Sequence, residues 1–273
     1  MNPKISIVTI NYNNSIGLEK TIQSVLIQNY QDIEYLVIDG GSIDESVDVI
    51  NKYSSSIHFW VSEKDSGVYN AQNKGIQNST GDYVLFLNSG DYFLDENSIS
   101  VLAKNNEDIL FGDIVYVSET NEKTEPTPDF LDLLFFFRST IPHPCSLIKR
   151  SLFLTYGLYK EDIKICADWA FFMDMIIKNK VTYKHVSRPI SAFVLGGISS
   201  KPESYSLIED EKEQYINLNY NLFFNLYVDN RRMKNKLRVI ETNRILARGS
   251  RILNLLIRFF PLKQKTILKA LIN

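Results

Sequence analysis

The residues with the clearest chemical potential come directly after a short apolar run at 84–87. That run shows no polar alternation, which is typical of a strand covered on both faces of a parallel sheet. Asn88 and Asp91 follow it, at the end of the strand where ligands bind on such sheets. Gly90 permits unusual backbone conformations and can turn Asp91 towards a cleft. The same residue types also form ordinary turns, so this stretch alone fits both a ligand site and a plain strand exit.

Two earlier apolar runs end in a similar way. Thr9, Asn11 and Tyr12 lie at the end of the first run, and Asp39 follows the second. The ends of neighbouring parallel strands face one cleft, so we expect these side chains to lie near Asp91. A single acid on a loop is usually solvated, but polar clusters after several strands favour a binding site.

Strands and helices alternate through the first half of the chain. We predict strands at 5–10, 34–38, 57–61 and 84–87, and a helix after each of the first three, the third of them at 67–77. The first helix carries apolar residues at one-face spacing, namely Leu18, Ile22, Val25 and Leu26. Ser42 and Glu45 form a capping-box pattern that predicts the start of the second helix, which runs to about Tyr53. This alternation predicts an α/β fold with a mainly parallel sheet and helices on both faces.

The pattern is looser after Asp91. We predict short helices at 99–103 and 130–137, strands at 109–117 and 146–149, a helix at 168–177, strands at 181–186 and 190–195, and one aromatic-rich helix at 203–228. Pro126 and Pro128 indicate a loop between the strand at 109–117 and the helix that follows.

Composition and cysteine spacing limit the class of protein. The chain has 273 residues, of which 44% are hydrophobic and 23% charged, as in ordinary globular proteins. Cys145 and Cys166 lie far apart and match neither a metal nor a redox spacing, so a reducing cytoplasmic setting is expected. The sequence enters its first strand without a signal-peptide pattern, and no run reaches the roughly 18 apolar residues of a spanning helix. No nucleic-acid partner is expected.

The charge is unevenly distributed along the chain. The net charge is −2, yet residues 231–273 hold twelve Lys or Arg and one acid, Glu241. A helix over 251–260 would gather Arg251 and Arg258 on one face and apolar residues over much of the rest. Basic amphipathic helices lie in the membrane interface, so we expect this tail to bind an anionic membrane surface. Packing on its own domain or on a second subunit of a homodimer is the alternative.

Three stretches, 5–13, 37–46 and 62–75, resemble the motifs of nucleotide-sugar glycosyltransferases of the GT-A fold. The closest similarity is to bacterial family 2 enzymes of exopolysaccharide and O-antigen assembly. After Asp91 the match is thinner and rests on the segments 142–144, 167–169 and 195–199. The resemblance implies one GT-A-like domain at 1–228, divided into a nucleotide-sugar-binding half at 1–95 and an acceptor half at 96–228. A basic amphipathic helical tail would follow at 229–273.

The resemblance assigns donor-binding roles by position. Asp39 would accept a hydrogen bond from the base, while Thr9, Asn11 and Tyr12 would line the base and ribose pocket. The next shell of residues would be Asp65, Gly67, Asn73 and Lys74, of which Lys74 could meet a phosphate or be a solvated helix lysine.

A divalent cation, Mn²⁺ or Mg²⁺, is implied at Asp91. Such a cation suits oxygen ligands and would stabilise the charge that develops on the leaving nucleoside diphosphate. The family often carries two acids here, whereas this chain has Asn88 in the earlier position. Asp91 is therefore the expected metal ligand, and Asn88 an uncharged donor-binding neighbour.

The second half is expected to supply the acceptor side. In inverting members of the family, an acid before an aromatic residue acts as the general base, and Asp168 with Trp169 matches that pattern. The alternative for Asp168 is a helix N-cap, which Asp fills well. His143, between two prolines, could touch phosphate, metal or acceptor.

The expected activity is inverting transfer of a hexosyl or N-acetylhexosaminyl group. The donor would be a UDP-sugar, and the acceptor a glycan or lipid-linked molecule of bacterial surface polysaccharide synthesis, at the inner face of the membrane. A catalytically silent binding or scaffold protein of the same fold is the alternative, because Asn88 could mark a decayed site. A dinucleotide-dependent dehydrogenase is disfavoured, since the stretch 11–17 holds one glycine where that class has a glycine-rich turn.

Overall fold

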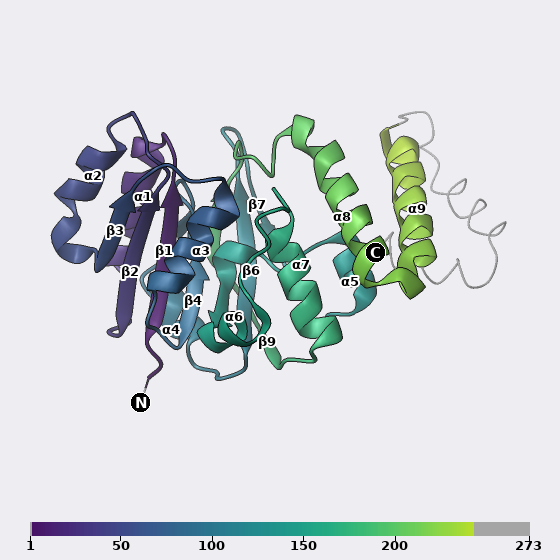
Figure 1. Ribbon diagram of the computed structural model, residues 1–273, viewed down its shortest axis with the longest axis horizontal. Coiled ribbons are helices and arrows are strands. Elements are labelled where there is room, and N and C mark those ends of the chain that lie inside the picture. The colour runs from purple at the N-terminus through teal and green to yellow at the C-terminus, as the bar shows by residue number, and fades with distance from the viewer. Residues whose placement is uncertain (1, 243–273) are drawn as a thin grey trace. The chain divides into compact units, whose positions relative to one another are not determined.

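The computed structural model describes residues 2–242 of the chain (Figure 1). The chain divides into two compact units, residues 1–215 and 216–273. The first unit contains a nine-stranded sheet of spatial order β3-β2-β1-β4-β8-β6-β9-β5, with β7 paired to β6, counted within the described residues. The predicted α/β fold with a mainly parallel sheet is confirmed.

The first half of the sheet is wholly parallel. Its strands are β1 (Ile5–Asn11), β2 (Ile33–Asp39), β3 (Phe59–Ser62) and β4 (Tyr83–Phe86). The helices between them are α1 (Ser15–Leu26), α2 (Ser46–Lys52) and α3 (Val68–Asn78). β1 lies between β2 and β4, and Asn11 pairs in register with Asp39. The polar residues that follow these strands therefore lie at one edge, as the sequence predicted.

The second half of the sheet is mixed. β8 (Ser146–Lys149) runs antiparallel to both β4 and β6 (Ile109–Val117), whereas β9 (Tyr183–Val194) runs parallel to β6. Two short antiparallel strands, β5 (Tyr92–Phe93) and β7 (Glu122–Glu125), complete it. The helices of this half are α4 (Ser98–Leu102), α5 (Leu133–Arg138), α6 (Arg150–Tyr156) and α7 (Ala167–Met173).

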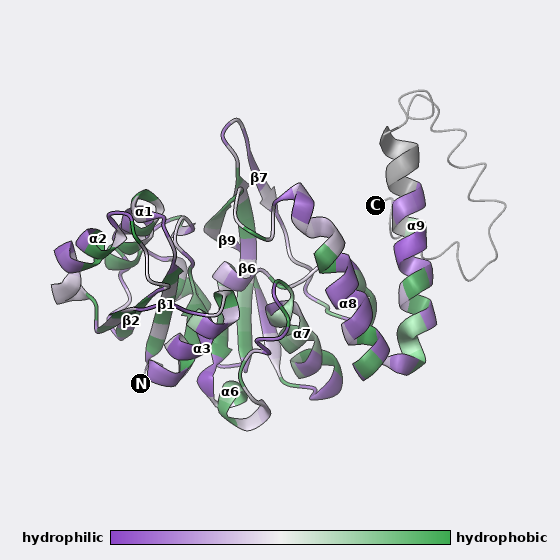
Figure 2. Cartoon of the chain, turned by 45° about the horizontal axis from the view of Figure 1, so that its top comes forward, coloured by the Kyte–Doolittle hydropathy of each residue, from purple (hydrophilic) through white to green (hydrophobic). Residues whose placement is uncertain are grey.

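Helices cover both faces of the sheet, as predicted. On one face Ile7, Val37 and Leu85 form a buried cluster with Leu18 and Ile22 of α1. Figure 1 shows α3, α6 and α7 in front of the sheet, on the opposite face, and Figure 2 shows largely hydrophobic central strands beside hydrophilic residues on α3 and α8.

The close approach of α3 to β1 depends on a glycine. A Cβ added at Gly75 would lie 2.3 Å from Val8 Cγ1, so a larger residue would force the helix away from the strand. The side chains of α3 are thereby held close to the sheet.

Several predicted elements differ from the structure. The capping box is wrong: α2 begins at Ser46 with no side-chain cap at Glu45, because the Ser42 hydroxyl bonds Asp39 instead. The two strands predicted at 181–186 and 190–195 are one strand, β9, in which register shifts against β6 accommodate the interruption. Leu26, predicted to lie on the apolar face of α1, is 41% exposed.

Three further elements were not predicted. β7 forms by pairing with β6, β5 by pairing with β9, and α6 follows β8 directly. β7 carries four exposed polar residues, so no apolar alternation in the sequence marks it as a strand. The helix predicted at 168–177 begins at Ala167 and changes to a π-helical turn at Asp174–Lys178.

The second unit is described from residue 216 to 242. It contains the end of α8 (Tyr205–Asn219), a 3-10 turn at Asn221–Phe223 and α9 (Phe224–Thr242). The single helix predicted at 203–228 is therefore wrong. The predicted boundary at 228 falls inside α9, and the division into 1–228 and 229–273 stays a prediction. The helix predicted at 251–260 lies outside the described residues, and no described helix is long and apolar enough to cross a membrane.

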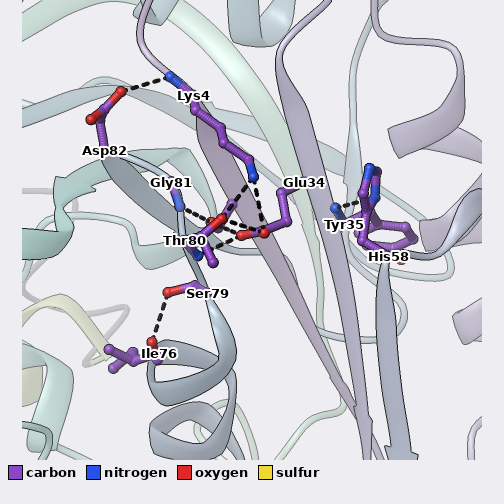
Figure 3. A network of polar contacts seen from close by, with 10 residues as sticks. Lys4, Glu34, Tyr35, His58, Ile76, Ser79, Thr80, Gly81 and Asp82 are labelled. Carbon is purple, nitrogen blue, oxygen red and sulfur yellow. Dashed lines mark hydrogen bonds and ion pairs between the residues drawn. The ribbon is translucent and has the colours of Figure 1, made fainter.

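The amino ends of β1, β2 and β4 are tied together by the carboxylate of Glu34 (Figure 3). It accepts hydrogen bonds from the Ser6 hydroxyl and from the N–H and hydroxyl of Thr80, at 2.7 and 2.6 Å, and it pairs with Lys4 Nζ at 3.1 Å. Burial opposes ionisation, but the hydrogen bonds from Ser6, Thr80 and Lys4 outweigh it and lower the pKa of Glu34 to about 2.

Replacing this carboxylate tests its contribution to stability. Glu34→Gln should lower the free energy of unfolding at pH 7 by about 2–3 kcal/mol, because the folded pKa lies well below the ordinary value. The stabilisation is complete above the ordinary value of 4.5 and is lost as the pH falls towards about 2. The difference between parent and variant in urea unfolding should therefore narrow from pH 7 to pH 3. A constant difference would contradict this account, and Glu122→Gln, exposed on β7, is the control.

Candidate functional site

Two adjoining cavities lie at the carboxyl ends of β1 and β4. The first, of about 480 Å³, includes Asn11, Tyr12, Asp65 and Gly67 in its lining. The second, of about 500 Å³, includes Asp91, His143 and Asp168. Residues common to both linings are Val68, Asn88, Ser89, Gly196, Gly197 and Ile198. Most of the residues predicted to act on a donor and an acceptor are thus brought to one connected space.

Asp39 lies at the carboxyl end of β2 and is fully buried. One carboxylate oxygen accepts from Asn11 Nδ2 at 2.7 Å and from the Ser42 hydroxyl, and the other from the Ser42 N–H at 2.9 Å and the Ser62 hydroxyl at 2.6 Å. Burial opposes ionisation, but hydrogen bonds from Ser42, Ser62 and Asn11 outweigh it and lower the pKa of Asp39. A carboxylate offers about four acceptor positions, and all four are used here.

The neighbouring Asn11, unlike Asp39, keeps an acceptor position that no hydrogen bond uses within the described part of the chain. The Asn11 side chain is oriented by Asp39 and lines the first cavity, and its buried Oδ1 has no hydrogen-bond partner among the described residues. Asn11 is therefore better prepared than Asp39 to accept a hydrogen bond from a bound base.

Asp91 is set by the turn that follows β4. Gly90 has φ +105°, a conformation that favours glycine, and its N–H donates to the Thr21 hydroxyl at 3.0 Å. The Asp91 carboxylate is 5% exposed, and its Oδ1 accepts from the Val194 N–H at 3.0 Å. Burial raises the pKa of Asp91 to about 7, because this backbone hydrogen bond only partly offsets the loss of water.

The residues around Asp91 fit a hard divalent cation. The Gln72 side chain is 1% exposed, lines the same cavity, and carries an Oε1 with no hydrogen-bond partner among the described residues. Asn88 Oδ1 lies 3.5 Å from Gln72 Nε2, so a second amide oxygen is close by. Over residues 2–242, no group of three or more His, Cys, Asp and Glu gathers as a metal site. The donor set suits a cation that takes its remaining ligands from phosphate and water.

Asp168 lies in the first turn of α7 but does not cap the helix. The N-cap residue is Cys166, and the N–H groups of Lys164, Ile165 and Cys166 all donate to the Glu211 carboxylate from α8, at 2.6–3.1 Å. The N-cap alternative for Asp168 is therefore wrong. Its side chain is left to face the second cavity.

Two side chains, Tyr69 and His143, lie next to the Asp168 carboxylate. The Tyr69 hydroxyl lies 2.8 Å from Asp168 Oδ1 and 2.6 Å from the Ile165 carbonyl. His143 Nδ1 lies 3.9 Å from Asp168 Oδ2, and His143 Nε2 lies 2.9 Å from the Tyr159 hydroxyl. Burial lowers the pKa of His143 although the Asp168 charge opposes this. Burial thus favours the neutral form of His143 beside the acid.

Besides Asp39, four predicted residues lie outside both cavity linings. The Thr9 hydroxyl is buried 3.0 Å from that of Tyr35, Asn73 bonds the Tyr159 backbone, and Lys74 pairs with Glu63 at 2.7 Å. Trp169 is buried beside a third cavity, and its Nε1 donates to the Phe136 carbonyl at 2.7 Å. Their donor and acceptor roles stay predictions.

Sequence reasoning missed several residues that line the cavities, among them two residues of α3 and two lysines. Tyr69 and Gln72 stand inside the stretch 62–75 that carried the resemblance, so their motif was visible although their roles were not. Lys164 lines the second cavity and Lys201 the first, and both bring positive charge to linings whose acids are Asp65, Asp91 and Asp168. No local pattern marks these lysines, because their positions depend on the loops before α7 and α8.

The chain matches the family model described as Glycosyl transferase family 2 over residues 6–173. An uncharacterized glycosyltransferase of Mycobacterium tuberculosis (strain ATCC 25618 / H37Rv) is 30% identical over 216 residues, which cover 76% of this chain and 81% of that protein. A PGL/p-HBAD biosynthesis glycosyltransferase of the same strain is 29% identical over 210 residues, with coverages of 72% and 80%.

Two solved structures share the fold. The S. aureus TarS fragment 1-349 in complex with UDP-GlcNAc aligns with a TM-score of 0.61 and 16% identity, over 78% of this chain and 66% of that one. The mannosyltransferase PcManGT from Pyrobaculum calidifontis, in complex with GDP-Man and Mn²⁺, aligns with a TM-score of 0.55 and 15% identity, over 79% and 62%. The chain therefore spans slightly less than two thirds of either solved chain.

The family model and the curated relatives define the class as a glycosyltransferase, and the solved structures show that it has the GT-A fold. The chain belongs to glycosyl transferase family 2. The resemblance that the motifs at 5–13, 37–46 and 62–75 suggested is confirmed by a family match that includes all but the first residue of these stretches.

The burial of Asp91 can be tested by removing its charge. Asp91→Asn keeps the size of the side chain and an oxygen that can accept from the Val194 N–H. The substitution removes the buried negative charge, which in the parent protein is stabilised by that backbone hydrogen bond. We expect the melting temperature, measured at pH 8 in EDTA, to rise by several degrees, since each kcal/mol shifts it by about 2–4 °C in a domain of this size. The exposed control Asp162→Asn should leave it unchanged, and a fall in the Asp91 variant would contradict this assignment.

Proposed function

We propose that this protein transfers a sugar from a nucleotide donor, UDP-linked, to an acceptor hydroxyl with inversion at the anomeric carbon. The observation that carries the proposal is that Asp91 and Asp168 line one cavity, which adjoins a second cavity lined by Asn11, Tyr12 and Asp65. A cation or diphosphate site, a proton acceptor and a nucleoside pocket then lie side by side.

The nucleoside would occupy the cavity that includes Tyr12 and Asp65. Asn11 would accept a hydrogen bond from the base, and Asp39 would hold Asn11 in position. Lys201 lines this cavity and could neutralise a phosphate. Donor binding of this kind is supported by the fold shared with a UDP-GlcNAc complex and a GDP-Man complex, and the choice of UDP is part of the proposal.

Asp91, with the amide oxygens of Asn88 and Gln72, would hold Mn²⁺ or Mg²⁺ together with the donor diphosphate. The cation supplies electrostatic stabilisation to the leaving nucleoside diphosphate. The burial of Asp91 and the unpartnered Oε1 of Gln72 support this role. The solved mannosyltransferase complex with Mn²⁺ supports it by fold alone.

Asp168 would act as the general base. The acceptor oxygen forms a bond to the anomeric carbon as the bond from that carbon to the diphosphate oxygen breaks, and the hydroxyl proton moves to Asp168. The Tyr69 hydroxyl faces two acceptors, the Ile165 carbonyl and Asp168 Oδ1, with one proton. Once Asp168 is protonated it can donate to Tyr69 while Tyr69 donates to Ile165. The hydrogen bonds around Tyr69 are therefore fully satisfied only when Asp168 is protonated, which is its state after proton transfer.

The wider role is proposed from the resemblance and from the relatives. A hexosyl or N-acetylhexosaminyl group would be moved to a glycan or lipid-linked acceptor in bacterial surface polysaccharide synthesis. One similar protein carries the name of a PGL/p-HBAD biosynthesis glycosyltransferase. We further propose that residues 229–273 hold the protein at the inner face of the membrane through anionic lipid, or join two copies as a homodimer.

The donor and cation proposals make one joint prediction. Incubation with UDP-, GDP- and dTDP-sugars and Mn²⁺ should release nucleoside diphosphate from one donor class. Asp91→Ala should lose most of this turnover, and Asn88→Ala less, because a neutral amide contributes little charge to the cation. Release measured by a coupled nucleotide assay is the readout. No release from any donor would favour the catalytically silent binding protein instead.

The base proposal predicts a selective loss. Asp168→Asn keeps the shape but cannot take a proton, and the N-cap position of α7 belongs to Cys166, so folding and donor binding should survive. Transfer to the acceptor should fall by about 10²- to 10⁴-fold. Rates at saturating donor and cation give the measurement, with Asp174→Asn as the matched control on the following turn. Transfer within about threefold of the parent would exclude Asp168 as the base.

A further inference from the structure

A third cavity, of about 340 Å³, is also lined by Asp168. Its walls are mainly apolar and come from the first unit, including Ile114 and Tyr116 of β6, Phe193 of β9, and Tyr205 and Ile208 of α8. This volume falls at the lower end of the ~300–1,000 Å³ typical of small-molecule sites. The proposed donor machinery does not use it.

The third cavity is continuous with the catalytic space. Asp168, His143 and Phe193 line both this cavity and the one that holds Asp91. A molecule that presents a hydroxyl to Asp168 can therefore place an adjoining apolar group against the walls of the third cavity. The shared lining gives this cavity the position of an acceptor subsite.

Apolar side chains make up most of the cavity lining. Its polar groups, apart from Asp168 and His143, are those of Thr140, Ser199, Ser200, Lys212 and the hydroxyls of Tyr116 and Tyr205. Thr140 contributes a buried Oγ1 that has no hydrogen-bond partner among the described residues, and Lys212 lies over the Trp169 ring at 5.1 Å from its centroid. A further sugar ring would need partners for several hydroxyl groups, because a buried hydroxyl without one is costly. An apolar group with a single linking oxygen near Thr140 would satisfy the cavity better.

We propose that the acceptor carries an apolar aglycone directly beside the sugar or hydroxyl that reacts, and that this aglycone binds in the third cavity. The inference rests on the proposed function, since it takes Asp168 as the base. It narrows the acceptor class to a glycolipid or an aryl or alkyl glycoside, and it disfavours the interior of a long polysaccharide.

Binding of simple glycosides tests the proposal without transfer. The chain has two tryptophans, so Trp60→Phe leaves Trp169 as a fluorescence reporter beside the cavity. Methyl, phenyl and octyl glycosides of glucose, galactose and mannose are titrated into the full chain below the micelle concentration. The octyl or phenyl member of at least one sugar should bind about tenfold or more tighter than its methyl partner, from the apolar area buried. Equal binding of methyl, phenyl and octyl members throughout would overturn the proposal.

A matched pair of variants locates the binding. Ile208→Asn makes one wall of the cavity polar, whereas Leu207→Asn changes the adjacent residue of α8, which does not line it. The preference for octyl or phenyl glycosides should be lost in Ile208→Asn and kept in Leu207→Asn. Retention in Ile208→Asn would show that the apolar group binds elsewhere and would overturn the proposal.

Failure of this inference and failure of the proposed function are separable. Release of nucleoside diphosphate reports the donor reaction and needs no glycoside, so its presence with equal glycoside binding rejects the apolar subsite alone. Selective octyl or phenyl binding that Ile208→Asn abolishes supports the subsite whatever the donor assay gives.

Discussion

The packing of α3 against the segment before α7 is the constraint on which the site depends. The Asn73 side chain donates to the Tyr159 carbonyl at 2.9 Å and accepts from the Tyr159 N–H at 3.0 Å. One turn earlier, the Tyr69 hydroxyl lies against Ile165 and Asp168. Gln72, on the same face, points to the cavity of Asp91. One helix face thereby fixes the proposed base relative to the proposed cation site.

The buried acids at the amino and carboxyl ends of the strands differ in how many hydrogen bonds their carboxylates accept. Glu34 and Asp39 each receive several hydrogen bonds, so their pKa values are lowered despite burial. Asp91 is equally buried, but its carboxylate is bonded to the Val194 N–H alone among the hydrogen bonds described, and its pKa rises to about 7. The first two acids suit structural roles. Asp91 is a carboxylate whose ionised form would gain most from a nearby cation.

Local sequence determined the parallel half of the fold and much of the donor side. Apolar runs of strand length alternate with amphipathic helices there, and parallel pairing then forces Asn11, Asp39 and Asp91 to one edge. The local sequence was a weaker guide to helix capping. Ser42 could bond either the first turn of α2 or Asp39, and the buried Asp39 carboxylate, which needs hydrogen-bond donors, is the stronger competitor. The exposed strand β7 had no apolar signal at all.

Tertiary structure alone decided what surrounds Asp168. Its motif was visible in the sequence, but an Asp at this position fits an N-cap as well as a base. Only the start of α7 at Ala167, with Cys166 as the N-cap residue, removes the first possibility. The lowered pKa of His143 and the apolar cavity beside Trp169 likewise arise from residues far apart in the chain. Short-range patterns encode strands, helices and turns, whereas burial and hydrogen-bond competition depend on which distant segments meet.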